Sequence, residues 1–159
     1  MSEILAIDIG TTHSGYAVLK MPFELLEFGK VSNEELLQIV KSGLYDKLIY
    51  EEFQSYGMPI GVSTIQSITW NGRYIQSALD VGREVFPVFR KDEKLLLCGS
   101  LKAKDSNIRQ ELINRYAKHD FKNGKGVKAN PDTFYGVSKD VWQAIAVGVT
   151  YYEITQNPI

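Results

Sequence analysis

The sequence has few cysteines and histidines, the residues that form disulfides and that supply many metal ligands and catalytic nucleophiles or bases. Its 159 residues include one cysteine and two histidines. Cys98 has no partner for an internal disulfide, which favours a reducing compartment. His13 and His119 form no Cys/His cluster that could bind zinc, and no Ser-His-Asp or Cys-His pattern is present. The chemistry of this chain is therefore expected to depend on other side chains.

Long apolar runs are also missing. No stretch approaches the roughly 20 residues that a membrane-spanning helix needs. The first residues, Met-Ser-Glu, lack the basic and apolar regions of a signal peptide and lead directly into an apolar segment. These absences predict a cytoplasmic protein without a membrane partner.

The charge is small overall but unevenly distributed. The net charge is −1, whereas residues 90–128 carry 11 of the 18 Lys+Arg and 5 of the 19 Asp+Glu. A basic segment on a mildly acidic body is suited to binding phosphates. A solvated lysine-rich surface is the alternative interpretation, and charge alone does not separate the two.

Hydrophobic periodicity predicts strands alternating with helices after an initial hairpin. Together they predict a single α/β domain, residues 1–159, with a mixed β-sheet flanked by helices on both faces. Residues 118–135 are polar and Gly-rich and predict a mobile loop, and Asp105 is expected to cap the helix that follows it. The expected strands are 4–8, 15–19, 23–29, 47–53 and 85–90, and the expected helices are 63–81, 106–116 and those opened by Ser32 and Ser138.

Asp8 is the most informative acidic residue, because it ends the apolar strand Leu5-Ala6-Ile7-Asp8-Ile9-Gly10. A carboxylate buried there is costly unless a metal or a partner compensates its charge. The following glycine lets a phosphate or metal approach the backbone. The alternative is a structural aspartate that accepts hydrogen bonds from the turn at Thr11 and Thr12.

A second carboxylate ends the strand Leu48-Ile49-Tyr50-Glu51-Glu52-Phe53. Neighbouring side chains of a strand point to opposite faces, so one of Glu51 and Glu52 can share a face with Asp8. The other is expected to be solvated or paired with a base.

The third carboxylate, Asp140, lies at the start of the last predicted helix. If Ser138 is the N-cap, Asp140 lies in the first turn, where the helix dipole favours a negative charge. An acid in the first turn is common, and it need have no further role. Gln143 follows one turn later on the same face, where its amide oxygen could ligate a hard cation or its water.

Three carboxylates on separate elements are typical of metal-dependent phosphodiester hydrolysis. Such hydrolysis needs an activated water and a neutralised leaving oxygen, and carboxylate-held Mg²⁺ can serve both. We therefore predict catalytic residues Asp8, one of Glu51 and Glu52, and Asp140, with Gln143 added to the metal ligands.

The order of these residues resembles the RuvC-like Holliday-junction resolvases, especially small phage-encoded members. The motifs are the acid-Gly of the first strand, a Glu on a later strand and Asp-Val-Trp-Gln-Ala-Ile-Ala-Val on the last helix. Leu97-Cys98-Gly99 and Ala103-Lys104-Asp105-Ser106-Asn107-Ile108-Arg109 add to the likeness. The resemblance implies an RNase H-like fold and a Mg²⁺- or Mn²⁺-dependent endonuclease of DNA recombination. It also implies a homodimer that cuts branched DNA, in the cytoplasm of a bacterial host if phage-encoded.

The resemblance assigns the first three acids to Asp8, Glu51 and Asp140, and it places Gln143 where the family has its fourth acid. An amide is a weaker cation ligand than a carboxylate, so we expect one metal site to be weak until DNA binds. The family's base-wedging aromatic falls near Gln54. Phe53 or Tyr56 could replace it, although Phe53 is expected in the core.

The basic residues and one helix complete the predicted interfaces. Trp70 and Trp142 are expected to pack rather than stack on bases, and Gly72, within helix 63–81, suits close packing in a dimer. That helix face could instead be buried on its own sheet. The predicted DNA-binding residues are Lys102, Lys104, Arg109, Lys122, Lys125 and Lys128.

Three other functions are compatible with the sequence. Residues 7–15 also resemble the first phosphate loop of the actin, Hsp70 and sugar-kinase superfamily, which predicts an ATP-binding lobe. That superfamily needs two lobes, and a second Asp-Gly-rich phosphate loop is not evident. A non-catalytic junction-binding protein and an RNA-processing nuclease are the other two.

Overall fold

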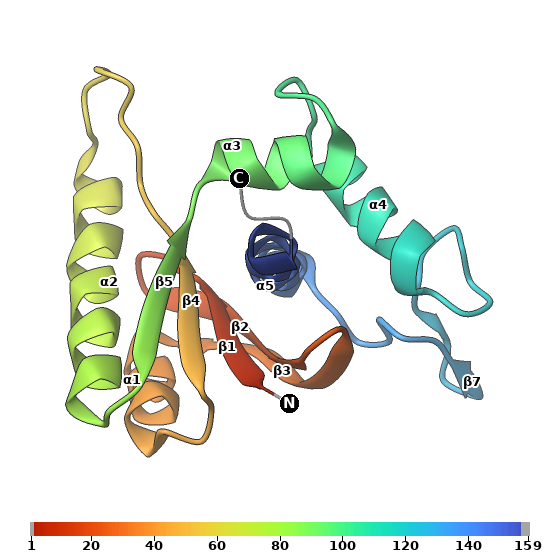
Figure 1. The fold of residues 1–159 in the computed structure, drawn as a ribbon, viewed down its shortest axis with the longest axis horizontal. Helices are drawn as coiled ribbons and strands as arrows, with labels where there is room; N and C mark the ends of the chain where they lie inside the picture. The colour runs from red at the N-terminus through yellow and green to blue at the C-terminus, as the bar shows by residue number, and fades with distance from the viewer. Residues whose placement is uncertain (1, 157–159) are drawn as a thin grey trace.

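Five strands form one mixed sheet in the computed structural model, which describes residues 2–156. Its strand order is β3-β2-β1-β4-β5 (Figure 1). The first three strands are antiparallel neighbours, and β4 and β5 run parallel to β1. The strands are β1 (Glu3–Asp8), β2 (His13–Lys20), β3 (Glu24–Ser32), β4 (Lys47–Glu51) and β5 (Glu84–Val88).

Helices cover both faces of this sheet, as the sequence predicts (Figure 1). Two helices pack on one face, the long C-terminal helix lies on the other, and a further helix packs on its outer side. Within residues 2–156, no helix is long and apolar enough to span a membrane. The helices are α1 (Asn33–Ser42), α2 (Val62–Asp80), α3 (Arg90–Glu93), α4 (Asp105–Tyr116) and α5 (Lys139–Gln156), and a π-helical turn, η1 (Lys94–Cys98), continues α3.

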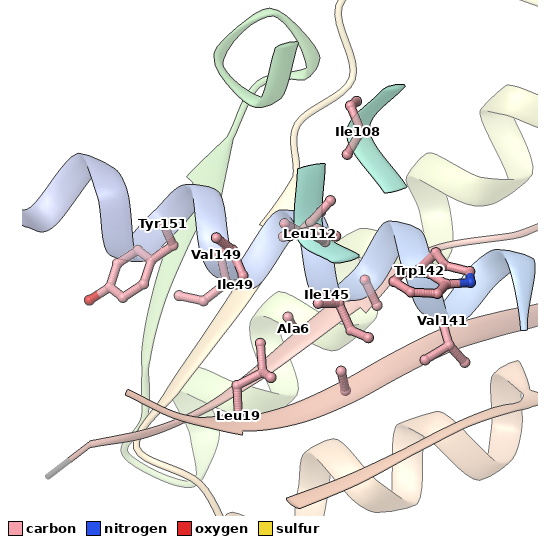
Figure 2. Close-up of a cluster of buried hydrophobic side chains, with 14 of the residues drawn as sticks. Ala6, Leu19, Ile49, Ile108, Leu112, Val141, Trp142, Ile145, Val149 and Tyr151 are labelled. Carbon is pink, nitrogen blue, oxygen red and sulfur yellow. The ribbon is translucent and has the colours of Figure 1, made fainter. Parts of the chain in front are cut away.

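The alternation of side chains along the strands divides the core in two. In β1, Leu5 and Ile7 face α1 and α2, whereas Ile4 and Ala6 face α5. Figure 2 shows Ala6, Leu19 and Ile49 of the sheet together with side chains of α5 and with Ile108 and Leu112 of α4. Both faces are apolar because each is covered by helices.

Close approach of α5 to the sheet depends on glycine. A Cβ on Gly148 would lie 2.4 Å from a methyl carbon of Leu19. This close packing buries the middle of the helix: all residues from Val141 to Tyr151 are buried except Gln143. The first turn of α5, which holds Asp140, is fixed by this packing.

The helix starts follow local capping chemistry. Ser32 accepts a hydrogen bond from the backbone N–H of Glu35, which confirms the predicted capping of α1. At α4 the prediction is wrong, because Lys104 occupies the N-cap position and Asp105 is the first helical residue. The Asn107 side chain accepts the Lys104 N–H in place of an aspartate cap.

Three further predictions need correction. The predicted strand 85–90 ends at Val88, and Arg90 begins α3. Phe53 is 41% exposed rather than part of the core. Residues 118–135 form hydrogen-bonded turns and a short hairpin, β6 (Gly126–Val127) with β7 (Asn130–Pro131), rather than a loop without regular structure.

Packing roles predicted for the tryptophans agree with the structure. Trp142 is buried, and its ring centroid lies 4.5 Å from that of Phe134. Trp70 lies along Tyr74 on α2, with ring centroids 5.8 Å apart.

Candidate active site

Strand parity places two acids on the α5 face of the sheet. Asp8 follows Ala6 at a spacing of two, and Glu51 follows Ile49 in the same way; Ala6 and Ile49 both belong to the α5-side core. Ile7 pairs with Tyr50, so Asp8 and Glu51 come next on adjacent parallel strands. Glu52 falls on the opposite face. The sequence left Glu51 and Glu52 open, and the sheet turns Glu51 toward Asp8.

A glycine on the neighbouring strand brings the third acid close. Gly15 pairs with Asp8 across the hairpin, and a Cβ added to it would lie 2.5 Å from the backbone oxygen of Asp140. Any larger residue would push the first turn of α5 away from the sheet. Gly15 therefore sets the approach of Asp140 to Asp8.

The predicted site residues meet in one pocket of about 510 Å³. Its walls come from the ends of β1 and β4, the beginnings of α3 and α4, the first turns of α5 and the hairpin loop. The lining side chains are Asp8, Glu51, Arg90, Asp105, Ser106, Ile108, Arg109, Lys125, Lys139, Asp140, Trp142 and Gln143.

The electrostatic repulsion in this pocket acts most clearly on the pKa of Asp8. Burial raises its pKa, and repulsion from Glu51 and Asp140 raises it further, to about 7. Arg90 and Lys30 oppose the shift without cancelling it. The carboxylates are therefore undercompensated by the bases around them, as expected for a site that accepts a cation.

Asp140 is held by a base that the sequence did not point to. The ammonium of Lys30, on β3, lies 2.7 Å from an Asp140 carboxylate oxygen. Lys30 and Asp140 are far apart along the chain, so no local sequence pattern could predict that they pair.

Glu93, at the end of α3, is the functional candidate that sequence reasoning missed. Its side chain is fully buried, and it accepts a hydrogen bond of 2.6 Å from the Gln143 amide nitrogen. The same nitrogen lies 3.5 Å from an oxygen of Glu51. Arg90 donates to Glu93 and also pairs with Asp105. Burial, followed by hydrogen bonding and repulsion from Glu51, raises the pKa of Glu93 strongly.

The donor set suits a hard divalent cation, although the side chains are not gathered around one point. Within residues 2–156, no three His, Cys, Asp or Glu side chains are arranged to hold a metal ion. Asp140 instead pairs with Lys30, and Glu51 faces the Gln143 amide. Carboxylate oxygens are the ligands that Mg²⁺ and Mn²⁺ prefer, and a cation would relieve the repulsion that raises the Asp8 pKa.

The predicted DNA-binding residues divide into two groups. Arg109, Lys122 and Lys125 line a hollow of about 610 Å³, and Arg109 and Lys125 also line the acidic pocket. Lys102 borders a different hollow on α4. Lys104 and Lys128 are exposed and line neither. The first group therefore forms a basic margin on one side of the acids.

The turn after Asp8 is closed by protein groups. Ser14 accepts the backbone N–H of Gly10, and its hydroxyl donates to buried Asn33. Asn33 in turn donates to the carbonyl oxygens of Gly10 and Thr11. The Gly10 N–H, which a phosphate loop would offer to a nucleotide, is already used within the protein.

Solved structures share this fold. The chain is similar to RuvC of Thermus thermophilus, at 15% identity, with a TM-score of 0.69 over 97% of this chain and 95% of the other. It is likewise similar to T. thermophilus RuvC in complex with a Holliday junction substrate, at 15% identity, with a TM-score of 0.71 over 98% and 96% of the two chains. No protein-family model matches, and no curated protein matches at the sequence level. The chain therefore has the RuvC-like, RNase H-like fold that its sequence predicts.

Proposed function

We propose that this protein is a divalent-metal-dependent endonuclease that cuts four-way DNA junctions. The observation that carries the proposal is the convergence of Asp8, Glu51 and Asp140 in one pocket beside a basic margin. The fold shared with RuvC, one structure of which holds a Holliday junction, supports the choice of branched DNA. The phage-type resemblance stays a prediction.

The pocket residues divide the work of hydrolysis. Asp8, Glu51 and Asp140 would hold Mg²⁺ or Mn²⁺, and Gln143, whose amide nitrogen faces Glu93 and Glu51, would add its amide oxygen from the same wall. When bound, the metal supplies Lewis acidity toward the phosphodiester and lowers the pKa of water. Lys30 neutralises the Asp140 carboxylate before a cation arrives. Arg109 and Lys125 bind the flanking phosphates and fix the scissile bond over the acids.

The active form is proposed to be a homodimer, since a four-way junction presents two symmetry-related strands. The candidate interface is the outer face of α2, where Ile65, Ile68 and Leu79 are 52%, 40% and 48% exposed. A Cβ on Gly72 would meet nothing within 4 Å in the subunit, so space for close helix packing is available. Sedimentation that shows a monomer both free and on DNA would contradict the dimer.

The test is incubation with labelled four-way, three-way and duplex DNA, with EDTA, Mg²⁺ or Mn²⁺. We expect paired cuts in four-way DNA that need the metal. Binding without cleavage under every metal condition would favour a non-catalytic junction-binding protein. Cleavage of RNA in preference to branched DNA would favour an RNA-processing nuclease, and tight ATP binding would favour the kinase-like interpretation.

A further inference from the structure

Gln143 contributes no charge to the acidic pocket, although it lies on the same helix face as Asp140. Its amide nitrogen donates to Glu93 at 2.6 Å and lies 3.5 Å from Glu51. One amide group thus joins two carboxylates that come from α3 and β4. The negative charge that position 143 lacks is present next to it, on a different element.

Glu93 is not satisfied by the protein in the way that a structural carboxylate is. Its Oε1 accepts from Gln143 and Arg90, whereas its Oε2 is buried with no hydrogen-bond partner among the described residues. A buried carboxylate oxygen without a donor costs free energy that a native site recovers through a protein donor, an ordered water or a bound ion. The neighbouring acid Glu51 can compensate it only by sharing a proton, because two ionised carboxylates repel each other.

Few of the bases near these acids form ion pairs with them. Among residues 2–156, the ion pairs of the four acids Asp8, Glu51, Glu93 and Asp140 come from Lys30 and Arg90. Arg90 is shared with Asp105 at the start of α4. The excess of partly and fully buried carboxylates points to a bound cation as the missing partner.

We propose that Glu93 is a fourth carboxylate ligand of the divalent cation, and that Gln143 holds it beside Glu51. The inference rests on the proposed function in taking the acidic pocket as a metal site. Gln143 then acts as a positioning residue for Glu93, whatever its own oxygen contributes. The charge set of the site is completed from α3 rather than from α5.

The experiment measures Mn²⁺ affinity by calorimetry and by the Mn²⁺ spin-resonance signal, without DNA. Glu93→Gln keeps the shape and the acceptor for Gln143 but removes the charge, and it should weaken Mn²⁺ binding about tenfold or more. Asp92→Asn is the matched control, because Asp92 lies on the same short helix but is partly exposed and, unlike Glu93, has no hydrogen bond to Gln143. It should leave the affinity unchanged.

The double variant Glu93→Gln with Gln143→Glu exchanges the carboxylate and the amide between the two hydrogen-bonded positions. We expect it to regain most of the lost Mn²⁺ affinity, which a variant that merely damaged the fold would not do. Unchanged affinity in Glu93→Gln, or a wild-type protein that binds no Mn²⁺, would overturn the inference.

A parallel junction-cleavage assay separates this inference from the proposed function. If Glu93→Gln loses Mn²⁺ affinity but wild type cuts no branched DNA, Glu93 is supported as a cation ligand and the proposed junction endonuclease activity is contradicted. If wild type cuts junctions while Glu93→Gln binds Mn²⁺ as tightly as wild type, the reverse holds.

Discussion

Buried carboxylates occur in two regions of this molecule, and their surroundings are opposite. Asp132, in the turn after β7, accepts the backbone N–H groups of Lys118, His119, Asp120 and Thr133 at 2.7 to 3.1 Å. Burial alone would raise its pKa, but these donors outweigh burial and hold the pKa well below its usual range.

Within the described part of the chain, Asp8 and Glu93 have no such set of backbone donors. Burial raises the pKa of both, and neighbouring acids raise it further. The contrast indicates that where a buried carboxylate has a structural role, as Asp132 does, backbone N–H donors stabilise its charge. At the acidic pocket Lys30 and Arg90 compensate the carboxylates only in part, and the proposed cation would supply the rest. Variants that alter one region or the other test this difference.

The largest effect is expected at Asp140. Asp140→Asn removes a proposed cation ligand and should lower junction cleavage by about 10³-fold or more, since metal stabilisation of the transition state is worth several kcal/mol. Junction affinity should stay close to wild type when measured by gel shift. A variant that still cuts at the wild-type rate would place Asp140 outside the catalytic group.

Gly15→Ala tests the placement of that acid without removing it. The new Cβ collides with the Asp140 backbone, so the first turn of α5 must move away from Asp8. A displacement of about 1 Å can cost about 100-fold in rate. Gly61→Ala is the control, because a Cβ there meets nothing within 4 Å. Equal single-turnover rates for the two variants would contradict the positioning role of Gly15.

Asp8→Asn should stabilise the metal-free protein at alkaline pH. The folded-state pKa of about 7 lies above the unfolded value, so wild type loses stability as the pH rises from the unfolded pKa through 7. The variant lacks this loss and should gain on the order of 2 kcal/mol at pH 8. Urea unfolding in EDTA at pH 5 and pH 8 measures it, and saturating Mg²⁺ should shrink the gain. A variant less stable than wild type at pH 8 would argue against an uncompensated charge.

Asp132→Asn should destabilise the folded protein, the opposite of the effect expected for Asp8→Asn. The depressed folded-state pKa of Asp132 contributes stability above the unfolded pKa, and this is lost as the pH falls below it. The variant replaces a charged acceptor of several backbone donors with an amide and should lower Tm by about 5 °C or more at pH 7. Thermal melts at pH 7 and pH 3 should differ less for the variant than for wild type. A variant Tm equal to wild type at pH 7 would mean that the N–H donors find other acceptors.

The smallest effect is expected in the basic margin. Arg109→Glu with Lys125→Glu should weaken junction binding about tenfold and lower the slope of log affinity against log salt by about one for each phosphate that is no longer bound. Lys102→Glu with Lys104→Glu should weaken binding to all sequences equally, and by less, since neither residue borders the acidic pocket. Lys41→Glu on α1, across the sheet, is the control. Unchanged affinity in both double variants would remove residues 90–128 from the interface.

The strands and the placement of Asp8 and Asp140 were predictable because their signals are local. Apolar strands that end in a carboxylate are visible in the sequence, and both Asp8 and Asp140 fall where they were expected. The choice between Glu51 and Glu52 was not, because it depends on which face α5 covers, and α5 lies about 90 residues further along the chain.

Glu93 had no local signal at all. It lies among Arg90, Lys91, Asp92 and Lys94, a run of charges that in sequence is typical of a solvated surface. Its burial arises because α3 and η1 fold over the start of α5, which is a tertiary contact. The ordered hairpin loop was missed for a related reason, since its turns are held by backbone N–H groups that bind Asp120 and Asp132 rather than by a periodic apolar pattern.

The position of α5 has a consequence for synthesis of the chain on the ribosome. This helix is the last of the described elements to be made, yet it forms the centre of the larger core and carries Asp140. A nascent chain that has not released residues 139–156 has one uncovered sheet face and an incomplete acid set. The proposed nuclease activity therefore arises together with completion of the core, so unfinished or truncated chains should not cut the DNA and RNA of the cell that makes them.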